Sequence, residues 1–191
     1  MNKSRLEAFS DAVTAIIITI MVLELKVPHD TNFEALRPLV PIFLSYVLSF
    51  IYLGIYWNNH HHLFQAVQRV NGNVLWANLH LLFWLSLFPF VTAWAGENLS
   101  ATVPVACYGF VLFCGAISYF ILTRTLIGHH GKDSTLAVAL GSDFKGKVSV
   151  ITYAVAILLA FVAPWLACLL YAVVAILWLI PDRRIEKALT S

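Results

Sequence analysis

The sequence predicts an all-α integral membrane protein with six transmembrane helices. Hydrophobic residues make up 60% of the 191 residues and charged residues only 12%, whereas soluble domains are about 45–50% apolar and 25% charged. Six apolar segments approach the ~20 residues that a spanning helix needs. Lys and Arg are concentrated in alternate connections between these segments, as the positive-inside rule describes for multi-pass proteins.

The first segment covers residues 4–27. It begins with Ser4-Arg5-Leu6-Glu7, which matches the capping-box pattern and predicts Ser4 as the N-cap. The remaining segments are residues 33–60, 73–95, 102–127, 147–162 and 165–180.

The last two segments are short and are separated only by Ala163-Pro164, so we expect a tight helical hairpin. Residues 128–146 are the only sizeable stretch outside the spans. This leaves no room for a nucleotide-binding domain, and the sequence has no Gly-rich phosphate loop. We therefore interpret residues 1–191 as a single transmembrane domain.

The distribution of positive charge predicts the orientation. With the N-terminus in the cytoplasm, ten of the twelve Lys and Arg residues fall in cytoplasmic segments and only Lys26 and Arg37 fall outside. Both termini are thus expected to be cytoplasmic, in the cell membrane. The net charge of +2 is too small and too dispersed to indicate a nucleic-acid partner. Cys107, Cys114 and Cys168 lie in apolar runs, which favours packing over metal or redox roles.

Asp11 is the unusual residue of the first segment, because a carboxylate near the bilayer centre costs about 2.5–3.5 kcal/mol. With Ile16 set at 0° and about 100° per residue, Asp11 falls near 220°, roughly opposite Ile16, Ile20 and Leu23. Asp11 and these isoleucine and leucine side chains therefore cannot line the same surface.

Two interpretations of Asp11 follow. It could form an ion-coordinating ring in a pore, or it could be a buried carboxylate held by neighbouring helices. The opposite-face geometry favours the second, structural interpretation. The candidate partners are Ser10, Arg5 of the same or an adjacent subunit, His61, Asn78 and His80.

The beginning of the first segment resembles a family signature. Arg5, Phe9, Ser10 and Asp11 stand in the register R-x-x-x-F-S-D, which is the signature of the family of the lysosomal potassium channel transmembrane protein 175. Other positions along most of the chain are also similar to the family: Trp57, His60, His61, Phe64, Asn78, Leu81, Pro89, Phe90 and Pro181 to Arg184. A single six-helix unit resembles the prokaryotic branch, whereas the animal protein has two such units.

The resemblance implies a homotetrameric, potassium-permeable cation channel and no enzymatic activity. The first helices would line a central pore that lacks the usual T-V-G-Y-G filter. By position, the constriction falls on Ile16, with Ile20 and Leu23 as further apolar rings that gate by dewetting. Thr19 occupies the position of a hydroxyl associated with potassium preference. The implied partners are further copies of the chain, membrane lipid and monovalent cations, with no cofactor beyond permeant K⁺.

The same residues have plainer interpretations when the family is set aside. Ile16, Ile20 and Leu23 would be ordinary lipid- or core-facing residues of a membrane helix. Thr19 would bond back to the Ala15 carbonyl, as membrane threonines often do. If Thr19 faces a pore, one ring of hydroxyls is a weak filter, so we expect modest selectivity.

Glu24 also has two interpretations. Four copies near an outer pore mouth would concentrate cations. Alternatively, Glu24 is a solvated helix end with Lys26 as a salt-bridge neighbour, and this second interpretation is favoured.

His60, His61 and His62 suggest a metal site. Adjacent helical residues point about 100° apart, so the three histidines cannot all bind one ion. Only a pair such as His61 and His80 could do so, and we expect no metal. The same pair defines the alternative function, a b-type haem cytochrome, although the surrounding asparagines better suit a hydrogen-bond network.

A proton-coupled transporter is the third functional class. It would need a carboxylate at the membrane midplane. Asp11 and Glu24 lie towards opposite ends of the first segment, which argues against this class.

Overall fold

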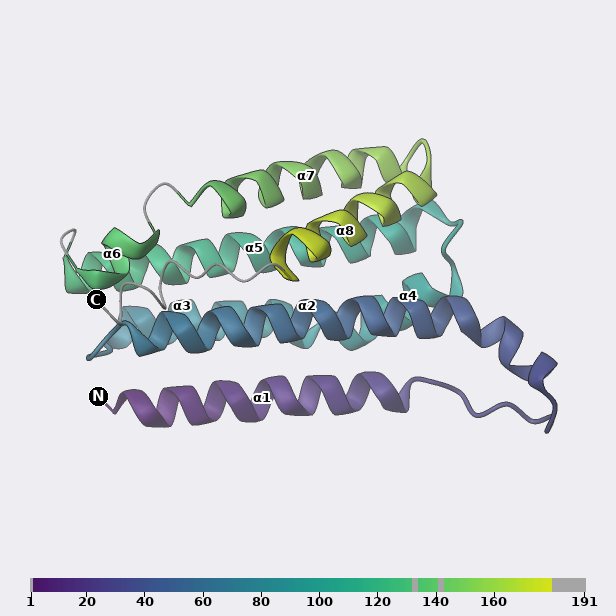
Figure 1. The fold of residues 1–191 in the computed structure, drawn as a ribbon, viewed down its shortest axis with the longest axis horizontal. Coiled ribbons are helices and arrows are strands. Elements are labelled where there is room, and N and C mark those ends of the chain that lie inside the picture. The colour runs from purple at the N-terminus through teal and green to yellow at the C-terminus, as the bar shows by residue number, and fades with distance from the viewer. Residues whose placement is uncertain (1, 132–133, 141–142, 180–191) are drawn as a thin grey trace.

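The computed structural model describes residues 2–131, 134–140 and 143–179, and these are helical apart from short connections (Figure 1). Two short elements, η1 (Phe33–Leu39) and α6 (Thr135–Leu140), lie in connections between longer helices. The longer helices are α1 (Lys3–Leu23), α2 (Val40–Gln65), α3 (Gly72–Ser86), α4 (Phe88–Glu97), α5 (Thr102–His130), α7 (Phe144–Ala160) and α8 (Pro164–Leu179).

The longer helices lie side by side along one axis (Figure 1). The beginnings of α1, α3 and α7 and the end of α5 lie at the same end of the bundle. Among the residues that the structure describes, four helical stretches are long and apolar enough to cross a membrane: α1, η1 with α2, α3 with α4, and α5. The 21 residues of α1 rise about 31 Å, close to the ~30 Å hydrocarbon thickness of a bilayer. The fold is therefore that of an all-α, multi-pass membrane protein.

Several sequence predictions fall outside the described residues. They concern Lys132, Ile180 at the end of the last predicted span, the Pro181 to Arg184 motif and Lys187, and with them the location of the C-terminus.

Pro89 divides the stretch that the sequence predicts as one span over residues 73–95. The α3 helix ends at Ser86 and α4 begins at Phe88, with Leu87 as the shared cap and Pro89 in the first turn of α4. Proline lacks a backbone N–H, and its ring clashes with the carbonyl four residues earlier. The helix breaks here because the chain cannot continue a regular hydrogen-bond ladder through this position.

The N-cap of α1 differs from the prediction. Asn2, not Ser4, occupies the cap, and its side-chain oxygen accepts a hydrogen bond from the backbone N–H of Ser4 at 3.0 Å. Asparagine is as good an N-cap as serine. The helix therefore starts at Lys3, earlier than an N-cap at Ser4 would allow.

Buried tyrosines fill the centre of the bundle. The Tyr52 ring contacts the rings of Phe88 and Tyr153, and the Tyr108 ring contacts that of Tyr171. The Tyr52 hydroxyl donates to the Tyr171 carbonyl, so these polar groups are satisfied inside the membrane-spanning region. This packing joins α2, α4, α5, α7 and α8 into one core.

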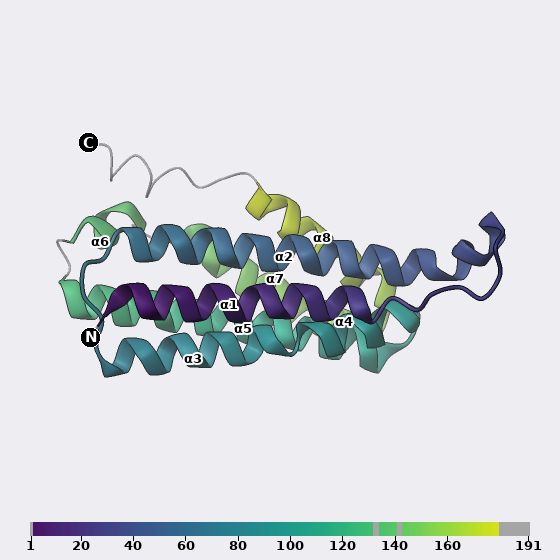
Figure 2. The ribbon, with the colours of Figure 1, turned by 90° about the horizontal axis from the view of Figure 1, so that it is seen from below.

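The α1 helix packs against this core on one side only. It contacts α2, α3 and α4, and Figure 2 shows it across the face that α2 and α3 form. Its buried residues are Leu6, Ser10, Thr14, Ile17 and Met21. The remaining circumference of α1 is largely exposed in the single chain.

Candidate functional site

The buried face of α1 is held at its first half by a chain of hydrogen bonds. Asn78 of α3 donates through Nδ2 to the Ser10 hydroxyl at 2.9 Å, and Ser10 donates to the Leu6 carbonyl at 2.9 Å. Asn78 Oδ1 lies 2.8 Å from His60 Nε2 of α2. Because an amide oxygen only accepts, His60 donates through Nε2. The three helices are thus joined by one polarised chain, which we call the Asn78 clamp.

A second set of contacts holds the later half of α1. The Thr92 hydroxyl of α4 donates to Ser49 Oγ of α2 at 2.7 Å and contacts Met21 Sδ at 3.9 Å. Ser49 is in turn 2.9 Å from the Tyr108 hydroxyl of α5. Met21 is only 2% exposed. This second group, the Thr92 contact, adds to the Asn78 clamp in setting how α1 is rotated about its axis.

A separate arc of α1, about 110° around the helix from the buried face, carries the apolar side chains that the family resemblance assigns to a pore. In the single chain, Ile16 is 56% exposed, Ile20 41% and Leu23 80%. Thr19 is also exposed, and its hydroxyl donates to the Ile16 carbonyl at 2.9 Å. The bond runs three residues back, where the sequence predicted the Ala15 carbonyl. The Thr19 oxygen keeps its acceptor capacity, so it can still contact a cation.

Asp11 lies on neither the buried face nor this apolar arc. It is exposed in the single chain, and its Oδ1 accepts a hydrogen bond from the indole Nε1 of Trp57 at 2.9 Å. The structure thus differs from the buried carboxylate expected from the sequence. Trp57 was not among the candidate partners, and it lies one turn before His61 on α2, with the two rings stacked 5.9 Å apart.

The other residues expected around Asp11 divide into separate contacts. Ser10 and Asn78 belong to the Asn78 clamp, with His60 in the place predicted for His61. His61 Nε2 lies 2.9 Å from Gln65 Nε2, and His80 Nε2 accepts from Trp84 Nε1 at 3.0 Å. His61 and His80 therefore each contact a residue one turn later in their own helices. Arg5 is exposed and makes no ion pair among the residues that the structure describes.

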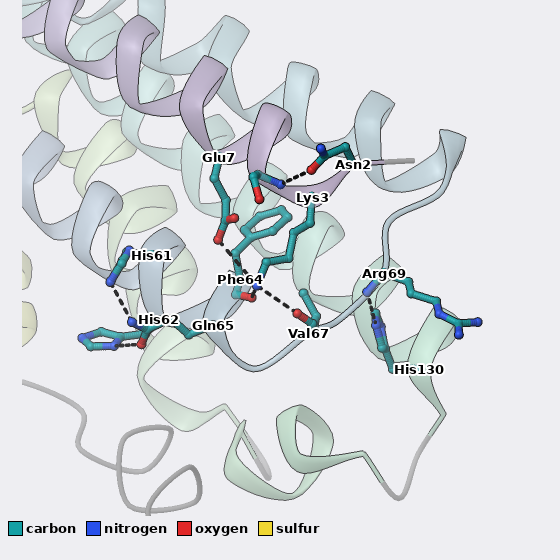
Figure 3. Close-up of polar contacts among 11 residues, drawn as sticks. Asn2, Lys3, Glu7, His61, His62, Phe64, Gln65, Val67, Arg69 and His130 are labelled. Carbon is teal, nitrogen blue, oxygen red and sulfur yellow. Dashed lines mark hydrogen bonds and ion pairs between the residues drawn. The ribbon is translucent and has the colours of Figure 1, made fainter.

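The start of α1 is fastened by a lysine that the sequence reading missed. Figure 3 shows Lys3 directed at the end of α2, where its Nζ donates to the carbonyls of Phe64 at 2.8 Å and Val67 at 3.1 Å. Glu7 lies 3.7 Å from the same amine. A cation near a helix C-terminus satisfies free carbonyls and interacts favourably with the helix dipole. The signal was visible as Lys3 and Glu7 at i and i+4.

Glu24 lies exposed at the end of α1, and the neighbouring ion pair is not the expected one. Lys26 pairs with Glu97 at the end of α4, with 2.7 Å between Nζ and Oε1. This hydrogen bond, together with the charge of Glu97, raises the pKa of Lys26 above its ordinary value. The contact ties the segment after α1 to α4 on the surface.

The histidines do not form a ligand set. Within residues 2–131, 134–140 and 143–179, no group of three or more His, Cys, Asp or Glu side chains could hold a metal ion. The three adjacent histidines have no common ligand between them: His60 contacts Asn78, whereas His61 and His62 both contact the side-chain amide of Gln65. These residues act as hydrogen-bonding groups.

Comparison with known proteins identifies the relatives of this chain. Residues 5–89 match the family model described as "Endosomal/lysosomal potassium channel TMEM175". A protein of Chryseobacterium sp. (strain P1-3) that is named a potassium channel is 57% identical over 189 residues, covering 99% of this chain and 98% of that protein. This chain belongs to the TMEM175 family. The resemblance predicted from the R-x-x-x-F-S-D motif is confirmed.

A solved structure extends the similarity of this TMEM175 chain to its fold. The crystal structure of a lysosomal potassium-selective channel TMEM175 homolog from Chamaesiphon minutus matches with a TM-score of 0.80 at 32% identity, covering 94% of this chain and 97% of that chain. A more distant relative, the endosomal/lysosomal proton channel TMEM175 of Danio rerio, is 28% identical over 135 residues. TMEM175 is a channel family and not an enzyme family. Nothing in these comparisons supports the haem cytochrome considered as an alternative.

Proposed function

We propose that this TMEM175 protein is a potassium-permeable channel of the cell membrane in which four copies surround a pore lined by α1. One observation carries the assignment of the pore: the apolar arc of Ile16, Ile20 and Leu23 is exposed on a helix whose buried face is fixed by polar contacts. The named potassium-channel relatives support the choice of ion.

In the proposed pore, Ile16 forms the constriction and Ile20 and Leu23 form the next rings. A narrow apolar tube does not hold a continuous water column, so an ion cannot cross without losing its hydration shell. Thr19 contributes one ring of oxygens between these layers. Because one hydroxyl ring replaces little of that shell, selectivity for K⁺ over Na⁺ should be modest. Glu24 would lie at the outer mouth.

The proposed assembly also accounts for Asp11 and Arg5. A charged group on the lipid-facing side of a span raises the free energy by about 2.5–3.5 kcal/mol near the bilayer centre. The exposed Asp11 therefore needs a partner that shields it from lipid. Arg5 lies about 120° away around α1 and is exposed as well. We propose that Arg5 of an adjacent copy approaches Asp11, with Trp57 fixing the carboxylate. Asp11 then acts at the subunit contact and does not touch the ion.

The proposed topology has six spans with both termini cytoplasmic, in one domain. Here α1, α2, α5, α7 and α8 each cross once and α3 with α4 crosses as a broken helix. The charge bias supports this orientation, since Lys26 and Arg37 lie just after α1 and in η1, at the other end of the bundle from the remaining Lys and Arg residues that the structure describes.

Reconstitution into liposomes tests the channel. Under opposed K⁺ and Na⁺ gradients, the reversal potential of the wild-type protein should lie closer to the equilibrium potential of K⁺ than to that of Na⁺. The ratio of K⁺ to Na⁺ permeability should be well below several hundred. An imposed pH gradient in the same assay measures proton permeation. Absence of any conductance would refute the proposed function.

Ile16→Asn tests the constriction. A polar ring keeps water in the narrowest layer, so K⁺ flux should rise at least severalfold. The matched control is Ile176→Asn on α8, which makes the same change at a side chain that is 61% exposed against 56% for Ile16. Flux in this control should stay at the wild-type level. Equal flux for both variants would place the constriction elsewhere.

A further inference from the structure

A cavity lies away from α1, between α2, α5, α7 and α8. Its volume is about 380 Å³, within the usual size range of small-molecule sites. Buried Tyr52, Tyr56 and Tyr153 line its deepest part, and Ala116 of α5 forms part of a side wall. The lining is apolar nearly throughout, and these features describe a slot for a hydrocarbon group.

The polar residues of the cavity are gathered at one end, around the start of α7. Asp143, Lys147 and Asn59 line this end. Asp143 is already engaged as the N-cap of α7, accepting from the Gly146 N–H at 3.3 Å. Lys147 is exposed and forms no ion pair within the described residues. The end of the cavity therefore offers an available ammonium group beside the positive end of a 17-residue helix.

A second lysine reinforces this charge. The Lys145 ammonium lies 6.0 Å from the ring centroid of Trp178, which is itself a lining residue. The indole Nε1 of Trp178 donates to Ser149 Oγ at 2.8 Å, which holds the ring against α7. Lys147 thus lines the polar end of the cavity, and Lys145 adds a positive charge next to the lining residue Trp178.

The cavity runs along α7 from its cap to Tyr153, about 15 Å at the helical rise per residue. Its rim includes Phe120 and Ile151, which are 37% and 64% exposed. On a membrane-spanning bundle, such exposed apolar residues face lipid. The opening is therefore accessible from the bilayer, with its cationic end at the level where α7 begins.

We propose that this cavity binds one anionic phospholipid, with an acyl chain along Tyr52, Tyr56 and Tyr153 and the phosphate at Lys147. The occupant is argued from charge complementarity: an apolar slot ending at Lys147 and a helix N-terminus matches a hydrocarbon chain ending in an anion. The site does not depend on the pore assignment, because none of these residues belongs to α1. The lipid would join α2, α5 and α7 near their shared end.

Native mass spectrometry of the purified protein tests the site, with phosphatidylglycerol and phosphatidylcholine of identical acyl chains as probes. We expect phosphatidylglycerol to bind about fivefold more tightly than phosphatidylcholine, because a lysine near the surface favours an anionic lipid by about this factor. Lys147→Gln should remove that preference. Arg37→Gln, which neutralises an exposed cation in η1, should leave it unchanged.

Ala116→Phe tests the slot itself, since the added ring fills the side wall of the cavity. Retention of both lipids should fall severalfold while the size-exclusion profile stays that of the wild type. Equal affinity for the two lipids, or unchanged binding in both Lys147→Gln and Ala116→Phe, would overturn the proposal. A third outcome would also overturn the proposal: the wild type retains no lipid, and Ala116→Phe changes the oligomeric mass. The cavity would then be part of a contact between protein chains. None of these outcomes bears on K⁺ conduction.

Discussion

The two faces of α1 differ in a way that reverses the rule for a soluble helix. The face packed against the bundle carries Ser10 and Thr14 among its buried residues, whereas the exposed arc carries Ile16, Ile20 and Leu23. In lipid, apolar exposure carries no penalty, while hydrogen bonds between helices give association its direction. The polar contacts on the packed face therefore hold α1 at a fixed rotation, and the apolar arc is left for the proposed pore.

Breaking the Asn78 clamp should give the largest effect. Asn78→Ala leaves both Ser10 and His60 without their partner in a site with no exposed surface at Asn78. We expect a loss of about 2–3 kcal/mol in the free energy of unfolding, measured by denaturant titration in detergent. Leu79→Ala on the adjacent, 41% exposed position is the control. A similar loss in both variants would show that the clamp does not stabilise the fold.

Asp11→Ala should act mainly on assembly. Without the carboxylate, the proposed contact with Arg5 of an adjacent copy is lost. On dilution, the assembled variant should therefore dissociate at a higher protein concentration than the wild type in light-scattering measurements. Trp57→Phe keeps an aromatic ring in place of the indole but removes its N–H, and loss of that hydrogen bond should lower the free energy of unfolding by about 1 kcal/mol. An intact tetramer of Asp11→Ala with altered ion selectivity would instead put the carboxylate on the ion path.

The Thr92 contact should matter less than the Asn78 clamp. Thr92→Val keeps the shape but removes the hydroxyl that bonds Ser49, while Ser49 retains Tyr108. The expected loss of unfolding free energy is about 0.5–1.5 kcal/mol. Thr123→Val is a matched control, because the buried Thr123 hydroxyl has no hydrogen-bond partner among the described residues. That variant should be neutral or slightly stabilising, and thermal unfolding compares the two.

The surface pair of Lys26 and Glu97 should give the smallest effect. Since the folded-state pKa of Lys26 is raised above 10.5, its contribution is complete below the unfolded-state value and is lost as pH rises through the raised value. At pH 7, Lys26→Gln should therefore unfold at a slightly lower temperature than the wild type. This difference in unfolding temperature should vanish once the pH exceeds the raised pKa of Lys26. High salt should also reduce it. A difference that persisted at high pH and high salt would indicate packing instead of charge.

The fold was largely readable from the sequence because membrane helices are specified locally. The apolar segments of the sequence predicted the positions of α1, α2, α5, α7 and α8. For α1 and α5, the predicted ends lie within a few residues of the observed ends. The details that were predicted wrongly are places where one residue overrides a local sequence pattern. Asn2 took the cap that Ser4 was expected to provide, and Pro89 broke a stretch whose hydropathy alone indicates one continuous helix.

By itself, the sequence determined the membrane class, the family and the separation of Asp11 from Ile16 around α1, since these depend on composition, a motif and helical period. Only the tertiary structure decided the partners: His60 and not His61 for Asn78, Trp57 for Asp11, and Glu97 for Lys26. The physical reason is that a hydrogen bond between helices depends on their relative rotation and height to within an ångström. No periodicity within one helix contains that information.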